Sequence, residues 1–310
     1  MPTKKLPTNL LEAIRYFSDL DVATEYVASL RWPNGPVCPK CGGTEHSFLT
    51  TRRIWKCKAC KKQFSVKVGT IFEDSPLGLD KWLPAIWLAA NSKNGISSHE
   101  LARALGITQK SSWFMLHRIR KAMQSGSIEK LSGVVEVDET YVGGRAKNMH
   151  AKQRRERFGP RRGGTWGKTP VIGMVERGGR VRAEVVPNIR RQTLQGRVKA
   201  NVERGSEVYT DAFSSYVGLD WPFDHKRIDH MVSYVEGQVH TNHIENFWSL
   251  LKRGLHGTYV SVEPFHLFRY LDERVFTFNH RDLTDLGRFS AVLGNVANRR
   301  LTYLELTGKG

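Results

Sequence analysis

Three acidic residues lie where an isolated carboxylate would be costly to bury. Asp138 comes near the end of an apolar strand in VVEVDETYVGG, and Asp211 ends a second strand in EVYTDAFSSY. Glu245 borders an apolar helical stripe, which is formed by Ile244, Phe247, Trp248, Leu251 and Leu255. Either aspartate alone is typical of a strand-terminal turn. Two strand ends and a helix can converge at one edge of a sheet, so the three residues together predict one site.

Carboxylates gathered in this way repel one another unless divalent cations neutralise them. Hard oxygen ligands suit Mg²⁺ or Mn²⁺. Two such ions can activate a water or a 3′-hydroxyl and stabilise the leaving oxygen of a phosphodiester. Lys252 follows Glu245 by seven residues, about 10 Å along the same helix. Its charge can hold a DNA phosphate there, so these residues predict metal-dependent chemistry on DNA.

The four cysteines form two pairs, Cys38 with Cys41 and Cys57 with Cys60, and none is left over. In a reducing compartment this spacing favours a metal over disulfides. Two-residue separations let all four thiolates reach one tetrahedral Zn²⁺. The segments FLTTRRIWKC and KQFSVKVGTIF each have the pattern of a strand. The region predicts a zinc ribbon with one structural zinc, and a redox role is disfavoured because no βαβ pattern surrounds either pair.

Hydrophobic periodicity indicates helices over residues 5–32 and throughout 76–125. From about residue 133 the pattern changes to strands, in GVVEVDETYVGG, TPVIGMVERGGRVRAEVVP and SEVYTDA. Helical patterns return near 191–203, 241–253 and 263–281. The alternation of strands and helices predicts an α/β domain in the second half of the chain.

The segment ISSHELARALGITQKSSWFMLHRIRKAM has the pattern of a helix-turn-helix. Ser98 is the predicted N-cap, Gly106 the turn, and the second helix begins near Thr108. Leu101 and Leu105 should point inward. The polar residues available to face DNA are Gln109, Lys110, Ser111, Ser112, His117, Arg118 and Arg120. Trp113, Met115 and Leu116 are expected in the core.

The formal net charge of +18 and the pI near 9.9 favour a polyanionic partner. The N-terminus has no apolar signal core, and the longest apolar run, WLPAIWLAA, is too short to span a bilayer. We therefore expect a cytoplasmic protein without a membrane partner. The segment 145–168 carries nine Lys or Arg and one Glu without periodicity. It should be a loop that contacts the DNA backbone through Arg154, Arg155, Arg161 and Arg162.

These motifs together resemble the DDE transposases of bacterial insertion sequences, in the branch that carries an N-terminal zinc ribbon. The resemblance covers nearly the whole chain and rests on the cysteine pairs, VEVDETYVGGR, PVIGMVERGGRVRAEVVP, VYTDAFSSY, HTNHIENFWSLLKRGLHGTY and RYLDERVFTFNHR. It implies an RNase H-like catalytic domain with a five-stranded mixed sheet and flanking helices. Asp138 would fall on the first strand, Asp211 on the fourth and Glu245 on the following helix, with Lys252 as the family's basic residue.

The resemblance implies the following parts: a helical segment 1–32, a zinc ribbon 33–74, a helix-turn-helix domain 75–128, a catalytic domain 129–285 and a tail 286–310. The implied activity is Mg²⁺-dependent cleavage and strand transfer at transposon ends. The implied partners are double-stranded DNA, as element ends and target, and further copies of the chain in a homodimer or higher oligomer. Lys252 and Arg253 are then also DNA contacts.

Two alternatives stay open. Asn242 and Asn246 flank Glu245, and Asn242 competes for the third metal position. We favour Glu245, because it brings negative charge and has Lys252 seven residues later, and we take Asn242 as a hydrogen-bond partner of the ligands. A DNA-binding regulator on a catalytically inert scaffold is the alternative function. The three carboxylates argue against it, since a regulator has no need of them.

Overall fold

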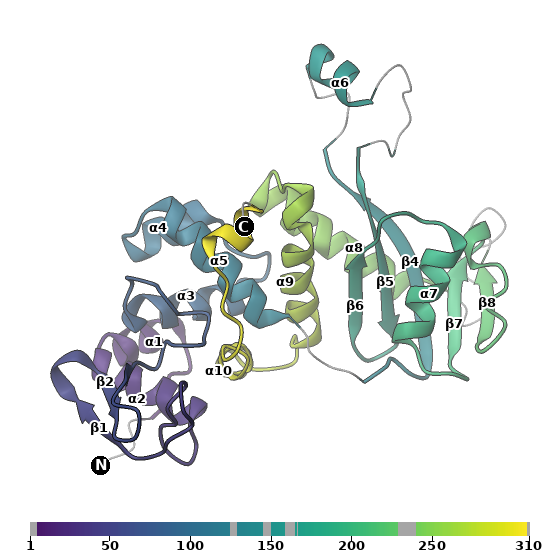
Figure 1. Ribbon diagram of the computed structural model, residues 1–310. Helices are drawn as coiled ribbons and strands as arrows, with labels where there is room; N and C mark the ends of the chain where they lie inside the picture. The colour runs from purple at the N-terminus through teal and green to yellow at the C-terminus, as the bar shows by residue number, and fades with distance from the viewer. Residues whose placement is uncertain are drawn as a thin grey trace. The chain divides into compact units, whose positions relative to one another are not determined.

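The computed structural model describes residues 5–124, 129–144, 150–158, 165, 167–228 and 240–308. The chain divides into two compact units, Met1–Gln124 with His280–Gly310, and Ser125–Asn279 (Figure 1). Within the described residues, no helix is long and apolar enough to cross a membrane.

The first unit is built around α3 (Leu79–Asn91), which buries Trp82, Leu83, Ile86 and Trp87 almost completely. Helices α1 (Leu10–Phe17), α2 (Leu20–Arg31) and α10 (Asp285–Gly294) pack against it. The predicted helical segment 5–32 is two helices, because the Asp19 side chain accepts N–H bonds from Asp21 and Val22 and starts α2 anew.

The C-terminal segment belongs to this first unit. The sequence predicts a tail from residue 286, whereas the structure has α10 and α11 (Tyr303–Thr307) there. Phe289 is fully buried, with its ring 5.1 Å from that of Trp87 and 5.6 Å from that of Phe17. Aromatic packing therefore holds α10 in the core, and the expected tail is wrong.

The cysteine region forms a three-stranded antiparallel sheet of β1 (His46–Leu49), β2 (Ile54–Cys57) and β3 (Gln63–Phe64). The segment FLTTRRIWKC, predicted as one strand, folds into a hairpin through the short 3-10 helix η1 (Thr50–Arg52). Arg53 turns the chain in the left-handed region, with φ of 53°. Of the next predicted strand, only Gln63 and Phe64 pair with β2.

Helices α4 (Ser98–Leu105) and α5 (Gln109–Met123) pack on each other across a short turn. Gly106 ends α4 with φ of 64°, and the Thr108 side chain caps α5. The N-cap of α4 is Ser97 and not Ser98. Ser97 and Glu100 form a reciprocal capping box, which leaves Ser98 as the first residue of the helix.

The second unit contains a five-stranded mixed sheet in the order β6-β5-β4-β7-β8. Its strands are β4 (Val134–Val142), β5 (Thr169–Glu176), β6 (Val181–Val185), β7 (Glu207–Asp211) and β8 (Asp224–Ile228). Strands β4, β5 and β6 are consecutive antiparallel neighbours, while β7 and β8 run parallel to β4. Strand β8 was not predicted, because DHKRI is mostly polar.

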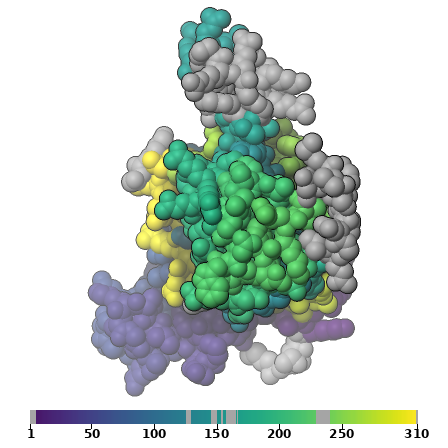
Figure 2. Space-filling view, turned by 90° about the vertical axis from the view of Figure 1, so that its right-hand side faces the viewer, coloured from purple at the N-terminus to yellow at the C-terminus, as the bar shows by residue number. Residues whose placement is uncertain are grey.

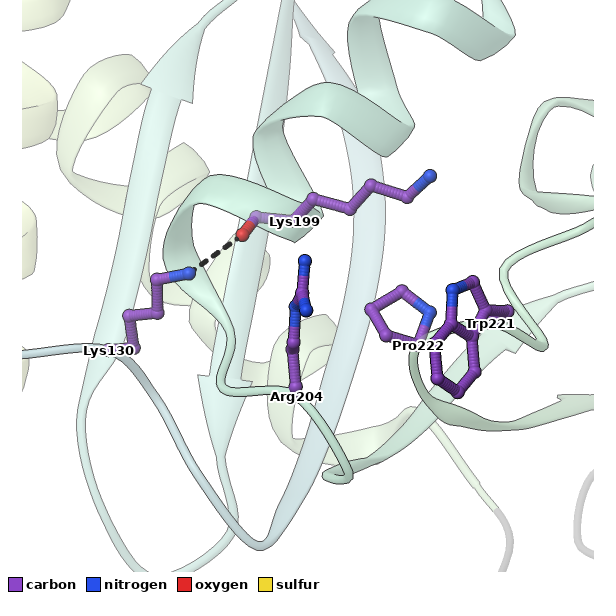
Figure 3. Close-up of a pocket in the computed structure, with 5 residues that line it drawn as sticks. All are labelled: Lys130, Lys199, Arg204, Trp221 and Pro222. Atoms are coloured by element: carbon purple, nitrogen blue, oxygen red, sulfur yellow. Dashed lines mark hydrogen bonds between the residues drawn. The ribbon is translucent and has the colours of Figure 1, made fainter.

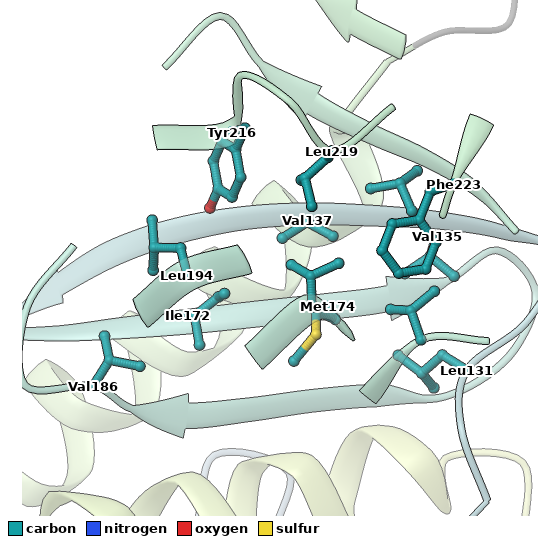
Figure 4. Packing of buried hydrophobic residues seen from close by; sticks show 13 residues of the cluster. Leu131, Val135, Val137, Ile172, Met174, Val186, Leu194, Tyr216, Leu219 and Phe223 are labelled. Carbon is teal, nitrogen blue, oxygen red and sulfur yellow. The ribbon is translucent and has the colours of Figure 1, made fainter. Parts of the chain in front are cut away.

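Helices cover both faces of this sheet. Helix α7 (Arg191–Asn201) and the 3-10 turn η3 (Ser214–Tyr216) pack on one face, over a core that includes Val135, Val137 and Met174 (Figure 4). Helices α8 (Asn242–Gly254) and α9 (Leu267–Asn279) pack on the other face. They are joined by a π-helical turn (Leu255–Tyr259) and the 3-10 turn η5 (Pro264–His266). Figure 2 looks onto one side of this unit.

The basic segment 145–168, predicted as a loop, contains helix α6 (Ala151–Phe158). Its sequence AKQRRERF has no apolar stripe, so periodicity gave no helical signal there. Residues 145–149, 159–164 and 166 lie outside the described residues.

Candidate active site and zinc site

The carboxylates of Asp138 and Asp211 meet where two parallel strands separate. The backbone pairing of β4 with β7 ends at Glu136 and Tyr209. Asp138 and Asp211 each lie two residues beyond this last pair, at matching heights. One side-chain oxygen of Asp138, one of Asp211 and one of Glu139 lie within 4.8 Å of one another. The sheet therefore brings together two residues that are far apart in the sequence.

The indole of Trp248 holds the carboxylate of Asp138 in place. Its Nε1 donates a hydrogen bond of 2.9 Å to Oδ2 of Asp138. Burial raises the pKa of Asp138 from 3.8 to about 6; the Trp248 hydrogen bond works against this, and the charges of Asp211 and Glu245 add to it. A divalent cation beside Asp138 would remove this penalty on the ionised form.

Glu139 is a third acidic group at this site, and the sequence analysis missed it. Its Oε2 accepts a 2.7 Å hydrogen bond from the buried hydroxyl of Tyr216. The pKa of Glu139 is raised to about 7. Burial is the main cause, the Tyr216 hydrogen bond opposes it, and the charges of Asp138 and Asp211 add to it. The available signal was the run EVDE, which places acids on both faces of an otherwise apolar strand.

Glu136 anchors the N-terminus of α8 to β4. This fully buried carboxylate accepts backbone hydrogen bonds from His243 (2.8 Å) and Ile244 (3.2 Å), the second and third residues of the helix. Its other oxygen accepts from Nε of Arg177 at 2.8 Å and lies 2.7 Å from Nδ1 of His243. A carboxylate from a strand thus serves as the cap that α8 lacks in its own sequence.

The same anchor has the composition of a metal site, since Glu136, His240 and His243 place ligand atoms within 4.8 Å of one another. Arg177 already supplies the positive charge beside Glu136, and two backbone N–H groups occupy the remaining oxygen. A further cation would be repelled by the guanidinium. We therefore interpret this cluster as the support of α8.

Close packing between α8 and β5 requires Gly173, which pairs with Asp138 across the sheet. A Cβ at this position would lie 2.5 Å from the ring of Trp248 and 2.7 Å from Cδ1 of Ile244. Any larger residue would push α8 away from the sheet. Gly173 therefore permits the approach that lets Trp248 reach Asp138.

Helix α8 places Glu245 at the border of the carboxylate cluster. The predicted stripe is confirmed: Ile244, Phe247, Trp248, Leu251 and Leu255 are all buried. Glu245 is exposed beside it, accepts a 3.4 Å hydrogen bond from Oγ1 of Thr241, and contributes its charge to the pKa of Asp138. Its oxygens are not among those within 4.8 Å of each other. Asn242, Lys252 and Arg253 are exposed on the same helix.

The four cysteines form a site of the size that zinc requires. Their sulfurs all lie within 4.8 Å of one another, with Cys38 3.7 Å from Cys60 and Cys41 3.6 Å from Cys57. Tetrahedral bonds of about 2.3 Å to one zinc place sulfurs roughly 3.8 Å apart. A Cβ on Gly43 would lie 3.3 Å from the Cys57 sulfur and 3.4 Å from the Cys41 sulfur, which is a tight contact, so the glycine leaves room for the sulfurs.

Backbone N–H groups favour the thiolate form of two of these cysteines, Cys38 and Cys57. The N–H of Cys60 lowers the pKa of the Cys57 thiol, against the effect of burial. Burial also raises the pKa of Cys38, but the N–H groups of Cys41 and Lys40 bring it down to about 7. Thiolates are the form that binds zinc. The donors and spacing of the cluster therefore fit a structural Zn²⁺.

Comparison with known proteins identifies a transposase domain and a zinc-ribbon domain in the chain. Residues 130–279 match the ISXO2-like transposase domain, and residues 19–63 match the transposase zinc-ribbon domain. An uncharacterized protein in transposable element ISH50 of Halobacterium salinarum is 30% identical over 247 residues, which are 75% of this chain and 82% of that protein. The chain belongs to the insertion-sequence transposases that carry an N-terminal zinc ribbon.

An uncharacterized transposase-like protein of Haemophilus influenzae is 37% identical to this transposase over 100 residues, which are 32% of the chain and 80% of that protein. The transposase domain match contains Asp138, Asp211, Glu245 and Lys252, and the zinc-ribbon match contains all four cysteines, Cys38, Cys41, Cys57 and Cys60.

The structure corrects several predicted DNA contacts of the transposase. Gln109 and Lys110 are exposed and Ser111 is half-buried at the start of α5. Ser112, His117, Arg118 and Arg120 are buried. Arg118 donates to the backbone oxygens of Ile71, Glu73 and Leu301, so its charge stabilises the interior of the first unit. Ser112 and Arg118 therefore cannot face DNA. Met115 and Leu116 are in the core as expected, and Trp113 is half-buried.

Of the four arginines predicted to contact DNA from the basic insertion, the structure describes the side chain of Arg155. Arg155 lies on α6 and is exposed. Arg154 lies on the same helix, but its side chain is outside the described part, as are Arg161 and Arg162 entirely. Their contacts with DNA stay predictions.

Proposed function

We propose that this transposase cleaves DNA at the ends of its insertion sequence and joins the freed 3′-hydroxyl to target DNA, with Asp138, Asp211 and Glu245 as ligands of two divalent ions. The observation that carries the proposal is the gathering of Asp138, Glu139 and Asp211 oxygens within 4.8 Å, beside a helix that carries Glu245 and Lys252. The strand order β6-β5-β4-β7-β8 supports an RNase H-like fold. Asp138 lies on β4, the first strand of this sheet along the chain, and Asp211 on β7, the fourth.

The chemistry of the donors suits hard cations. Carboxylate oxygens are what Mg²⁺ and Mn²⁺ prefer, and bound ions would supply charge stabilisation for the attacking and leaving oxygens of a phosphodiester. Burial, with a smaller contribution from neighbouring carboxylates, raises the pKa values of Asp138 and Glu139, and bound ions would favour the ionised forms.

Residues of the chain then have distinct tasks. Trp248 holds the Asp138 carboxylate toward the cluster. Glu136 and Gly173 hold α8 close to the sheet and so set the position of Glu245. Lys252 and Arg253 are exposed further along α8, where each can contact a phosphate of the strand being cut.

Recognition of the element ends belongs, in this proposal, to the first unit. The polar start of α5, with Gln109, Lys110 and Ser111, enters the major groove, and the zinc ribbon supports it. The basic insertion with Arg154, Arg155, Arg161 and Arg162 adds backbone contacts without reading sequence. Assembly as a homodimer or higher oligomer on DNA stays a prediction.

Cleavage of DNA that carries the element's own ends tests the proposal. Glu245→Gln keeps size and hydrogen bonding but removes the charge, so it should abolish Mg²⁺-dependent cleavage and joining while binding to the ends survives. Asn242→Ala, on the same helix and equally exposed, is the matched control and should only reduce the rate. An active Glu245→Gln variant with a dead Asn242→Ala variant would show that the third ligand is wrongly assigned. Full activity of Asp138→Asn would show that Asp138 is wrongly assigned, and binding of end DNA without cleavage by the unchanged protein would leave the DNA-binding regulator as the better description.

A further inference from the structure

A small basic pocket lies at the end of the sheet that is remote from the carboxylates. It is lined by Lys130, Lys199, Arg204, Trp221 and Pro222 (Figure 3). Lys130 precedes β4, Arg204 precedes β7, and Trp221 and Pro222 precede β8. These strands are parallel, so their N-terminal ends lie at one end of the sheet. The carboxylates of Asp138 and Asp211 lie toward the other end.

Backbone hydrogen bonds between the loops build this pocket. The N–H of Gly205 donates to the oxygen of Pro222, and the N–H of Leu131 donates to the oxygen of Asn201 at the end of α7. Nζ of Lys130 donates a 3.0 Å hydrogen bond to the oxygen of Lys199. These bonds hold the backbone segments that carry Lys130, Lys199 and Arg204 on a common frame.

The lining chemistry is that of a site for a nucleotide. No lining residue is acidic, and among the described residues Lys130, Lys199 and Arg204 make no ion pair with a carboxylate. Trp221 is 81% exposed, whereas the other tryptophans that the structure describes are buried or half-buried. Phosphate suits the cations, and a base can stack on the free face of the indole.

The dimensions favour part of a polymer over a free small molecule. The cavity measures about 210 Å³, below the roughly 300–1,000 Å³ typical of small-molecule sites. Duplex DNA can contact the cations but offers no free base face to Trp221, because its bases are already stacked on each other. Only an unpaired base uses both the tryptophan and the cations.

We propose that this pocket binds an unpaired nucleotide of a DNA strand, with the base stacked on Trp221 and the flanking phosphates on Lys199 and Arg204. The inference rests on the proposed function only for the identity of the strand as DNA. It assigns the transposase a second contact with its substrate, on the order of 20 Å or more from the carboxylates along β4.

Binding of fluorescent oligothymidylate to the full zinc-loaded chain tests this inference. Trp221→Ala should weaken the affinity roughly tenfold, as expected for one lost stacked base, and Trp221→Phe should retain most of it. Arg204→Gln should weaken binding and reduce its dependence on salt. The controls are Phe265→Ala, an exposed aromatic in the same unit, and Arg227→Gln, an exposed cation on β8. Both should bind as the unchanged protein does.

Two further measurements decide the mode of binding. Trp221→Ala should weaken binding to duplex DNA of the same length by less than about twofold. An abasic site in the oligonucleotide should abolish the difference in affinity between Trp221→Ala and the unchanged protein. Equal losses for single-stranded and duplex DNA, or no loss with either, would overturn the inference; no loss is the outcome expected if the pocket serves a protein partner. Glu245→Gln should keep the Trp221-dependent binding, so failure of the cleavage proposal and failure of this one are distinguishable.

Discussion

The zinc site and the carboxylate site differ in how far apart their residues lie in the sequence. All four cysteines fall within residues 38–60, and local turns such as the N–H of Gly42 to the oxygen of Cys38 orient them. In the carboxylate site, Asp138 and Asp211 meet only because β4 pairs with β7, and Glu245 borders them because α8 docks on the sheet. The first site depends on its metal, and the second depends on buried contacts such as those of Glu136.

Removing zinc should have the largest effect, and a local one. Cys57→Ser deletes a ligand whose metal supplies most of the folding free energy of the ribbon, on the order of 10 kcal/mol. We expect loss of the single zinc and of hydrogen-exchange protection in β1 and β2. Protection in β4 and β5 should stay unchanged. Loss of protection in both units would contradict the independence of the two sites.

Breaking the anchor of α8 should have the next largest effect. Glu136→Gln leaves Arg177 without its charged partner and places an amide NH₂ group next to backbone N–H donors. The free energy of unfolding should fall by about 3–5 kcal/mol. Urea unfolding measures this cost. The matched control is Glu207→Gln, at the half-exposed pair with Lys226, where a much smaller loss of stability is expected because solvent screens the charges. Equal losses of unfolding free energy in the two variants would show that Glu136 does not position α8.

The pH dependence of stability should reveal the cost of ionising the buried Asp138 carboxyl. The pKa of Asp138 is raised in the folded protein from 3.8 to about 6, so the folded state binds the proton more tightly than the unfolded state. Ionised Asp138 therefore lowers stability as pH rises from about 4 to 6, and the loss persists above that. Asp138→Asn should stabilise the protein in chelator by up to about 3 kcal/mol at pH 8.

Below about pH 4 the same variant should show no gain, since Asp138 is then protonated in both states. Urea unfolding at pH 4 and pH 8 measures the difference. A gain that is equal at both values would assign the effect to packing and not to charge.

Lys252→Ala should have the smallest effect. Lys252 is exposed on α8, so its loss removes one phosphate contact and leaves the carboxylate cluster intact. We expect a few-fold rise in KM for end DNA, a weaker dependence on salt, and unchanged metal affinity. A large drop in kcat with unchanged KM would instead place Lys252 at the reacting atoms.

The sequence predicted the parts of both sites that depend on local pattern. The paired cysteines specify the ribbon because two-residue spacing and glycine turns are sufficient to gather sulfurs. The apolar stripe of α8 predicted its buried face correctly, whereas the structure alone shows that Glu245 and Lys252 are exposed.

Interactions across the fold were beyond the reach of pattern. Glu139 and Glu136 look like ordinary strand residues until the structure brings Tyr216 to the first and the N-terminus of α8 to the second. Arg118 has the spacing of a DNA contact, yet three backbone oxygens distant in sequence bind it in the interior. Similarly, α10 is held by Phe289 in the core of the first unit, a contact that periodicity cannot reveal.

Binding of Mn²⁺ to the zinc-loaded transposase, followed by electron paramagnetic resonance in the presence of end DNA, tests the central claim most directly. The account predicts an exchange-coupled pair of Mn²⁺ ions in the unchanged protein, and loss of that pair in Asp138→Asn and in Glu245→Gln while the DNA stays bound. A pair that persists in both variants, or the absence of any bound Mn²⁺ in the unchanged protein, would contradict the assignment of these carboxylates as the metal centre.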